Sequence, residues 1–278
     1  MAPLRQSKGN YIRHMMSQKL FEECTLRAVE AAGAASRVLL GVIASSDEDL
    51  NIESKKDGSL VSDADYESQK VIASSLAPLA IPILSEEASI PDYDERKQWE
   101  YYWLVDPLDG TESFLENRSG FAVNIALCDN SGPIIGVVAD PLTNTIYKGV
   151  KGRGFSISQL SGANARTIKL SKSTQASKPY TLVTSWVESA PISKLCPPWI
   201  KSTDVVARSV SGSLKFCELA MGKAEIHART GPYMEWDCAA GDAILRSVGI
   251  DVFDINTHKR IEYNSEDLRV NGLYTSRV

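Results

Sequence analysis

Two aspartates lie three residues apart at the end of an apolar run, in the stretch WLVDPLDGTESF at residues 103–114. Pro107 restrains Asp106 to an extended backbone, so we expect a strand to end there and a turn to bring Asp109 back toward the same point. Two carboxylates that face one point suit a shared divalent cation, and oxygen donors of this kind select Mg²⁺ or Mn²⁺. The stretch therefore contains donor atoms for a metal site.

Gly110 and Thr111 follow these aspartates directly. A glycine removes the Cβ where a ligand must approach closely, and Thr111 begins a predicted short helix whose free N–H groups favour an anion. A phosphate bound to the metal would explain why carboxylates and amide donors lie side by side. Asp, Pro and Gly are also the commonest turn formers, so these twelve residues alone leave an ordinary turn equally open.

Further carboxylates lie at the borders of other predicted elements. Glu86 follows the short apolar run IPIL, and Asp237 lies at the start of a predicted helix in MEWDCAAG. Each has an ordinary explanation on its own, as a solvated loop charge for Glu86 and as an N-cap for Asp237. A haloacid-dehalogenase-type phosphatase would need D-x-D-x-T, which DPLDGT does not match, and the alternating ligands of an EF-hand are missing.

The elements that must position these residues change in type along the chain. We predict a long helix at 17–44, a second helix from Asp63 to near Pro78, a short strand at 81–87, a buried strand at 101–105, and a β-meander from 121 to about 157. Beyond residue 160, strands and helices alternate, which indicates a second α/β layer. We therefore expect an α+β or α/β fold with an N-terminal extension at 1–16, an α+β subdomain at 17–160 that holds most of the carboxylates, and an α/β subdomain at 161–278.

Composition excludes several classes of function. The chain has 278 residues, a net charge of −5 and no basic run, so long nucleic acid is a poor candidate for a partner. No apolar run approaches the roughly 20 residues needed to span a bilayer. The five cysteines include no C-x-x-C pair and are interpreted as reduced core residues of a cytoplasmic protein. The first 21 residues carry four basic and no acidic side chains, but they are short and not Ser-rich, which favours an extension over a transit peptide.

DPLDGTESF, with SEE upstream and WDCAAG downstream, resembles the lithium-sensitive, Mg²⁺-dependent phosphatase superfamily of inositol monophosphatase and fructose-1,6-bisphosphatase. Three separated motifs occur in that family's order, and the similarity extends from about Ser17 to the end of the chain. Within the superfamily, NIAL, GSLKFCELAMGKAEIHAR and GPYMEWDCAAG are more similar to the 3'(2'),5'-bisphosphate nucleotidases of the CysQ type. The resemblance implies a layered αβαβα sandwich of the sugar-phosphatase type.

The resemblance also implies a catalytic site that binds two or three Mg²⁺ ions. Its metal ligands would be the side chains of Glu86, Asp106, Asp109 and Asp237 and the carbonyl of Leu108. Metal ions would reverse the local charge and create a phosphate site within an acidic protein. Asp65 would pair with Thr111 to orient the attacking water, and the N–H groups of Gly110 and Thr111 would hold the phosphate oxygens.

Substrate selection is expected in the second half of the chain. The residues that resemble the nucleotidase substrate pocket are Ser211, Gly212, Ser213, Lys215, Arg229 and Glu235. Lys215 and Arg229 favour a substrate with a second phosphate, although both could instead be surface charges. Two departures concern the same pocket, because Glu112 replaces a basic residue that often follows DGT and SVSGSLKF differs from the usual G-S-S-L-K-F.

These inferences predict a Mg²⁺-dependent phosphomonoesterase that removes the 3'-phosphate of adenosine 3',5'-bisphosphate, with 3'-phosphoadenylyl sulfate as a second candidate substrate. An inositol or sugar-phosphate phosphatase with the same metals is the alternative enzyme. A catalytically silent phosphate-binding scaffold is the alternative from another class. The partner would be a small phosphate compound, a nucleotide by preference, with no membrane involved, and the protein would be a monomer or a homodimer.

Overall fold

The computed structural model describes residues 16–45, 52–54, 60–160, 166–168, 176–185 and 190–278. The predicted extension at 1–16 lies outside these residues except for Met16. No helix among them is long and apolar enough to cross a membrane.

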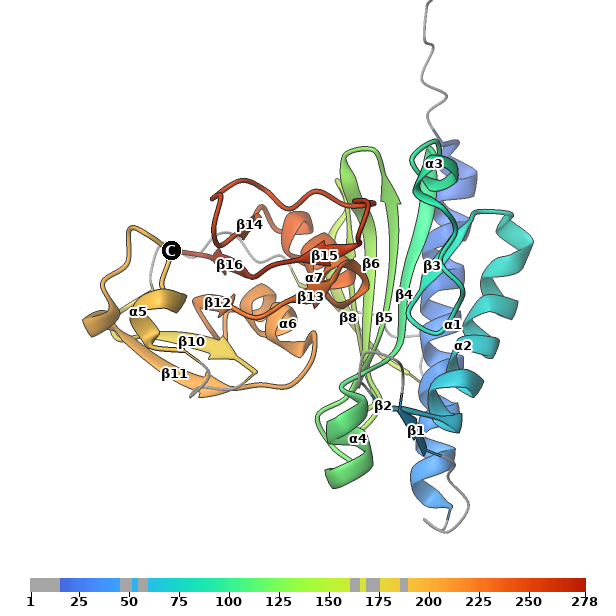
Figure 1. Cartoon of the computed structure of the whole chain (residues 1–278), viewed down its shortest axis with the longest axis horizontal. Helices are drawn as coiled ribbons and strands as arrows, with labels where there is room; N and C mark the ends of the chain where they lie inside the picture. The colour runs from blue at the N-terminus through green and yellow to red at the C-terminus, as the bar shows by residue number, and fades with distance from the viewer. Residues whose placement is uncertain (1–15, 46–51, 55–59, 161–165, 169–175, 186–189) are drawn as a thin grey trace, which may run out of the picture.

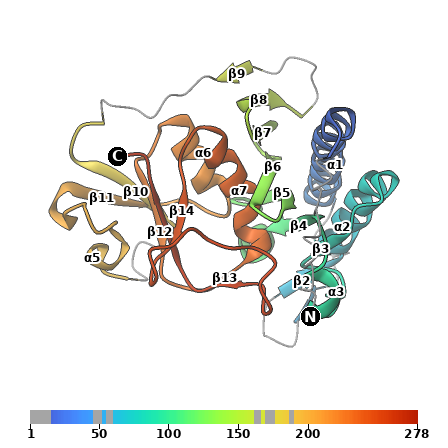
Figure 2. The same ribbon diagram turned by 90° about the horizontal axis from the view of Figure 1, so that it is seen from above.

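Five layers make up the molecule (Figure 2). Helices α1 (Gln18–Ala44) and α2 (Asp63–Leu76) cover one face of a seven-stranded sheet. Helices α6 (Leu214–Met221) and α7 (Glu235–Ser247) lie between this sheet and a five-stranded sheet (Figure 1). The short helix α5 (Ile192–Leu195) lies on the far side of the second sheet. This arrangement confirms the expected αβαβα sandwich.

The seven-stranded sheet has the order β3-β4-β5-β6-β7-β8-β9. Its strands are β3 (Ile83–Ser85), β4 (Tyr101–Asp109), β5 (Ala122–Asp129), β6 (Gly132–Asp140), β7 (Thr145–Val150), β8 (Gly154–Gln159) and β9 (Arg166–Ile168). Strand β3 is parallel to β4, and all later neighbours are antiparallel, as expected for a meander. The predicted hairpins after residue 121 are therefore confirmed.

The five-stranded sheet has the order β11-β10-β12-β16-β14, with β10 parallel to both of its neighbours. Its strands are β10 (Tyr180–Thr184), β11 (Val205–Ser209), β12 (Ile226–Arg229), β14 (Val252–Asp254) and β16 (Leu273–Ser276). Two small pairs join β1 (Ile52–Ser54) to β2 (Leu60–Ser62) and β13 (Tyr233–Met234) to β15 (Arg269–Val270). The remaining short helices are α3 (Tyr93–Arg96), α4 (Thr111–Asn117) and the 3₁₀ turns Ala77–Leu79 and Ser202–Asp204.

Strand β4 differs from the prediction because it does not end at Asp106. Asp106 pairs with Asn124 and Asp109 pairs with Ala122, so β4 contains one extra residue between these pairs. The irregularity is a β-bulge, and the Leu108 N–H donates to the Asp106 carboxylate over 3.0 Å within it. The β-bulge therefore replaces the turn expected between Asp106 and Asp109, and β4 continues through it.

Helix α7 joins the two predicted subdomains. It belongs to the second half of the chain, yet it packs on β5, β6 and β7 of the first sheet. The approach is close because a Cβ added to Gly136 would lie 2.2 Å from the Ala240 carbonyl oxygen, and one added to Gly149 would lie 2.3 Å from the Ile244 Cα. One buried core cluster contains residues of both halves. The division near residue 160 remains a prediction, since residues 161–165 are outside the described part of the chain.

Candidate active site

Three carboxylates meet where β3, β4 and α7 come together. The parallel pairing of Ser85 with Val105 places Glu86, the residue after β3, beside Asp106 on β4. Asp237 enters from the first turn of α7, where it accepts a hydrogen bond from the Met234 N–H over 2.9 Å. Each of Glu86, Asp106 and Asp237 offers one oxygen, and these oxygens lie within 4.8 Å of one another.

The negative charges of this cluster would be stabilised by a bound cation. Burial, followed by the charges of Glu86, Asp109 and Asp237, raises the pKa of Asp106 well above its ordinary value. Burial and the charges of Asp109 and Glu86 raise the pKa of Asp237 to about 8. Gathered carboxylates of this kind repel one another unless they are protonated or share a metal, and an all-oxygen donor set fits Mg²⁺ or Mn²⁺. The donors supplied by the chain therefore fit the expected ions.

Asp109 lies beside this group and is held by hydrogen bonds. Its Oδ2 accepts from the Ser213 backbone N–H over 2.5 Å, from the Ser213 hydroxyl over 2.6 Å and from the Asn124 amide over 3.1 Å. Ser213 is buried, so the prediction that it contacts the substrate is corrected: it contacts Asp109. Asn124 was not predicted to belong to the site, although the NIAL motif that contains it was noted.

Asp65 and Thr111 are in contact. The Thr111 hydroxyl lies 3.1 Å from Asp65 Oδ1 and also 3.1 Å from the Leu108 carbonyl oxygen, and its single proton can serve one of them at a time. Asp65 Oδ2 accepts from the Ser62 N–H over 2.8 Å and from the Ser62 hydroxyl over 2.7 Å, in a capping box at the start of α2. The buried Asp65 carboxylate is thus fixed at one oxygen and faces Thr111 with the other.

Gly110 makes the turn from β4 into α4. Its φ of 93° is in the left-handed region, and an added Cβ would lie 2.8 Å from the Gly120 carbonyl oxygen. Both features require glycine at this position. The turn leaves Thr111 as the first residue of α4, as expected.

The loop before α6 lies against the same turn. A Cβ added to Gly212 would lie 2.7 Å from Asp109 Oδ2, and one added to Gly120 would lie 2.7 Å from the Ser211 hydroxyl oxygen. Gly212 has a φ of 54°, which favours glycine here also. Gly212 therefore borders the Asp109 carboxylate and Ser211 borders Gly120, near the place where a substrate-binding loop is expected.

The two basic residues of the predicted substrate pocket have different environments. Lys215 is 1% exposed, and its ammonium group donates to the Ser185 hydroxyl over 2.9 Å and to the Val210 carbonyl over 3.2 Å. This burial excludes a solvated surface charge, and it lowers the pKa of Lys215 to about 8. Arg229 is half-buried, with its guanidinium carbon 4.3 Å from the centroid of the Tyr233 ring. Arg229 is close enough to the cluster to oppose the upward shift in the pKa of Asp237.

The prediction for Glu235 is wrong in this structure. Its side chain is fully buried, and its carboxylate accepts hydrogen bonds from the N–H groups of Asn264 and Ser265 and from the Ser265 hydroxyl. Sequence placed it correctly at the start of α7, two residues before Asp237, but it points into the loop at 264–265. Glu235 therefore holds that loop and does not face a substrate.

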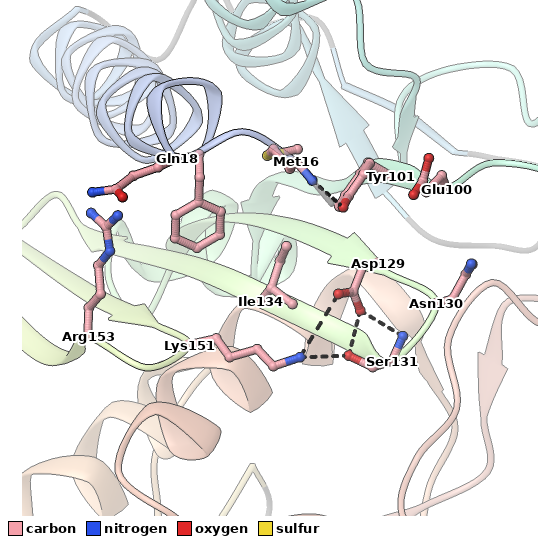
Figure 3. A pocket seen from close by; sticks show the side chains of 11 residues that line it. Met16, Gln18, Glu100, Tyr101, Asp129, Asn130, Ser131, Ile134, Lys151 and Arg153 are labelled. Carbon is pink, nitrogen blue, oxygen red and sulfur yellow. Dashed lines mark hydrogen bonds and ion pairs between the residues drawn. The ribbon is translucent and has the colours of Figure 1, made fainter. Parts of the chain in front are cut away.

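A separate hollow lies at the other end of strands β4 and β5 (Figure 3). Tyr101 and Asp129, which pair across these strands, both line it. Lys151 donates to the Ser131 hydroxyl over 3.0 Å and lies 4.0 Å from an Asp129 carboxylate oxygen. None of the predicted site residues borders this hollow.

Comparisons with known proteins show the family and the fold of the chain. The model of the inositol monophosphatase family matches residues 21–275. The 3'(2'),5'-bisphosphate nucleotidase CysQ of Shigella flexneri is 36% identical over 74% of this chain and 80% of its own, and that of Escherichia coli strain K12 is 34% identical over the same shares. The crystal structure of CysQ from Bacteroides thetaiotaomicron superimposes with a TM-score of 0.79 at 30% identity, covering 92% of this chain and 97% of that one. Inositol monophosphatase from Anabaena sp. PCC 7120 shares the fold, with a TM-score of 0.65 at 22% identity over 93% and 92% of the two chains.

Proposed function

The chain belongs to the inositol monophosphatase family, and we propose that it is a Mg²⁺-dependent phosphomonoesterase that hydrolyses the 3'-phosphate of adenosine 3',5'-bisphosphate. The observation that carries the proposal is the cluster of Glu86, Asp106 and Asp237, with oxygens within 4.8 Å, in a fold where Asp65 contacts Thr111 nearby. A binding protein would not need a carboxylate–hydroxyl pair in addition to metal ligands. This pair is the strongest argument against a silent scaffold.

The metal ions would be held by the three clustered carboxylates, by Asp109 through Oδ1 and by the Leu108 carbonyl. When bound, Mg²⁺ neutralises these carboxylates, binds phosphate and lowers the pKa of the attacking water. We propose two or three ions in this site, and Mn²⁺ fits the same donors.

The side chains of the site orient the reaction. Asp65 is fixed by Ser62 and accepts a hydrogen bond from the Thr111 hydroxyl, so the Thr111 oxygen can accept a hydrogen bond from a water directed at phosphorus. As this water attacks, its proton would pass to the Thr111 oxygen while the Thr111 proton passes to Asp65. The N–H groups of Gly110 and Thr111, at the start of α4, would donate to phosphate oxygens as negative charge develops on them. Water is thereby aimed from one side while the phosphate is held from the other.

The nucleotide assignment is supported by the CysQ relatives and by the cations near the cluster. We propose that Arg229 contacts the 5'-phosphate of the substrate, since Arg is suited to bidentate phosphate contacts and this one is half-buried. Lys215 would act indirectly. Its hydrogen bond to the Val210 carbonyl would hold the adjoining loop, which contains Ser211 and Gly212, in place. A sulfated nucleotide, 3'-phosphoadenylyl sulfate, is the second candidate substrate.

The test is phosphate release in the presence of Mg²⁺ from adenosine 3',5'-bisphosphate, inositol 1-phosphate, fructose 1,6-bisphosphate and AMP. We expect a clear preference for the bisphosphate nucleotide and its loss in Asp109→Asn. A preference for inositol or fructose phosphate would keep the chemistry and overturn the substrate. No release from any of the four compounds, with metal-dependent nucleotide binding retained, would favour the scaffold.

We also propose that the enzyme acts in the cytoplasm on a free small molecule. All five cysteines are free, and four of them are buried. Unpaired core thiols are typical of reducing compartments. Localisation of a fluorescent fusion, with cell fractionation as the second measurement, would test this.

A further inference from the structure

Asp109 is held in a different way from the other carboxylates of the site. Three hydrogen bonds end on one of its oxygens, Oδ2, and they come from the Ser213 N–H, the Ser213 hydroxyl and the Asn124 amide. Among the described residues, no hydrogen bond reaches the other oxygen, Oδ1. The two oxygens of one carboxylate therefore have distinct environments.

The donors and acceptors of this network include one choice, because the Ser213 hydroxyl lies near both Asp109 Oδ2 and the Asp237 carbonyl oxygen. The Asn124 amide donates one proton to Asp109 Oδ2 and one to the Ser213 oxygen, which lies 2.6 Å away. The Ser213 hydroxyl accepts from Asn124, and its only proton can go to Asp109 Oδ2 over 2.6 Å or to the Asp237 carbonyl oxygen over 3.0 Å. The shorter distance and the negative charge of the carboxylate favour Asp109 as the acceptor. A flipped Asn124 amide would bring its oxygen against the Asp109 carboxylate, which is repulsive. The orientation is kept even though Asn124 Oδ1 finds no partner among the described residues.

We propose that Asn124 and Ser213 are positioning residues that saturate Oδ2 of Asp109, so that this aspartate binds metal through Oδ1 alone and in one orientation. Both side chains are buried, at 0% and 1% exposed, so water cannot replace their hydrogen bonds. Asn124 is on β5 and Ser213 precedes α6, so the network also fixes the first sheet against the helix layer. The inference rests on the proposed function, because it assumes that Asp109 is a metal ligand.

The test measures metal binding with no substrate present. Free Mn²⁺ is followed by its electron paramagnetic resonance signal during titration of the whole protein. Ser213→Ala is expected to bind Mn²⁺ roughly tenfold more weakly than wild type, since hydrogen-bond partners of metal ligands typically have effects of this size. Ser36→Ala is the matched control, because Ser36 is equally buried but donates only to the Ala32 carbonyl within α1.

Further variants separate positioning from folding. Asn124→Ala should weaken Mn²⁺ binding to a similar extent, and the double variant should lose little more than either single one, because the residues form one chain of donors. Ser213→Thr keeps the hydroxyl and should restore binding, and thermal unfolding without metal identifies any variant that fails to fold.

Equal Mn²⁺ affinity in wild type, Ser213→Ala and Asn124→Ala would overturn the positioning role and leave the proposed function standing. If wild type itself binds no Mn²⁺, both the positioning role and the metal-dependent function are wrong. Ser213→Thr that folds but binds as weakly as Ser213→Ala would also contradict the donor role.

Discussion

Asp65 and Thr111 are 46 residues apart in sequence but in contact, and in the proposed mechanism this pair would act as the general base. We expect Asp65→Asn and Thr111→Val each to lower kcat by roughly 10²- to 10⁴-fold, with a much smaller change in KM. The kcat of the double variant should be no lower than that of the less active single variant, because the two side chains act on the same proton. Steady-state kinetics of the four proteins measures this.

Folding must be separated from chemistry in that experiment, because Asp65 also caps α2. Ser62→Ala removes one hydrogen bond to the same carboxylate, over 2.7 Å, and leaves Thr111 in place. Its free energy of unfolding should fall by about 1 kcal/mol, as for other lost caps. Losses of kcat that multiply in the double variant would show that Asp65 and Thr111 act independently.

The raised pKa of Asp237 predicts how the stability of the metal-free protein depends on pH. An ordinary aspartate titrates near pH 3.8, whereas folded Asp237 has a pKa of about 8. Between these values the folded state binds more protons than the unfolded state, so the stabilising effect is complete below pH 3.8 and is lost as the pH rises toward 8. Asp106 shifts in the same direction.

In thermal unfolding experiments in EDTA, the stabilising contribution of protonated Asp237 should therefore decrease from about pH 5 to about pH 8. Asp237→Asn is the matched variant, because an amide keeps the shape and cannot titrate. The Tm of wild type should fall relative to the Tm of Asp237→Asn as the pH rises. A difference that is constant across this range would contradict the shifted pKa.

Sequence patterns predicted the clustered carboxylates better than the residues that support them. Asp106 and Asp109 could be found from their spacing, since both lie on one strand. The partners of Asp109 could not, because Asn124 and Ser213 are ordinary polar residues until β5 and the loop before α6 meet. Glu235 shows the opposite error, since its position at the start of α7 was right but the direction of its side chain depends on residues 264–265.

At the scale of elements, the site depends on how closely α7 approaches the first sheet. Gly136→Ala would place a Cβ 2.2 Å from the Ala240 carbonyl oxygen, and the helix must move to accept it. We expect a loss of about 1–3 kcal/mol in the free energy of unfolding, together with weaker Mn²⁺ binding, because α7 carries Asp237. Urea unfolding and the Mn²⁺ titration measure the two effects.

Gly41→Ala is the matched control for this prediction. Gly41 lies in α1, is exposed, and its added Cβ would meet nothing within 4 Å. The same chemical change should there raise stability by roughly 0.5–1 kcal/mol through helix propensity. Unchanged Mn²⁺ binding in a destabilised Gly136→Ala would show that the position of α7 does not control the metal site.

Element types were predictable because their hydrophobic periods are clear, as in the antiparallel strands after residue 121. The bulge in β4 was not, since Pro107 suggested that the strand would end, whereas pairing resumes at Asp109. The packing of α7 on the first sheet was also beyond sequence patterns. It depends on two glycines, Gly136 and Gly149, that lie on separate strands and face the same helix.

At the scale of the whole molecule, the proposed metal ligands connect layers that are far apart in sequence. Glu86, Asp106 and Asp109 belong to the first sheet and its border, whereas Asp237 belongs to the helix layer between the sheets. Metal binding should therefore stabilise the fold as well as permit catalysis, since the unfolded chain does not bring these donors together. At a Mg²⁺ concentration about 100 times its Kd, the gain should be about 2.7 kcal/mol per site.

For a chain of this size, such a gain corresponds to a rise in Tm of roughly 5–10 °C. Differential scanning fluorimetry across a Mg²⁺ titration, with Asp109→Asn in parallel, would measure it. The rise should continue with the logarithm of the Mg²⁺ concentration in wild type and be smaller in the variant. If both proteins respond equally, the ion acts elsewhere on the surface, because a gain that depends on four carboxylates from two layers must shrink when one of them is neutralised.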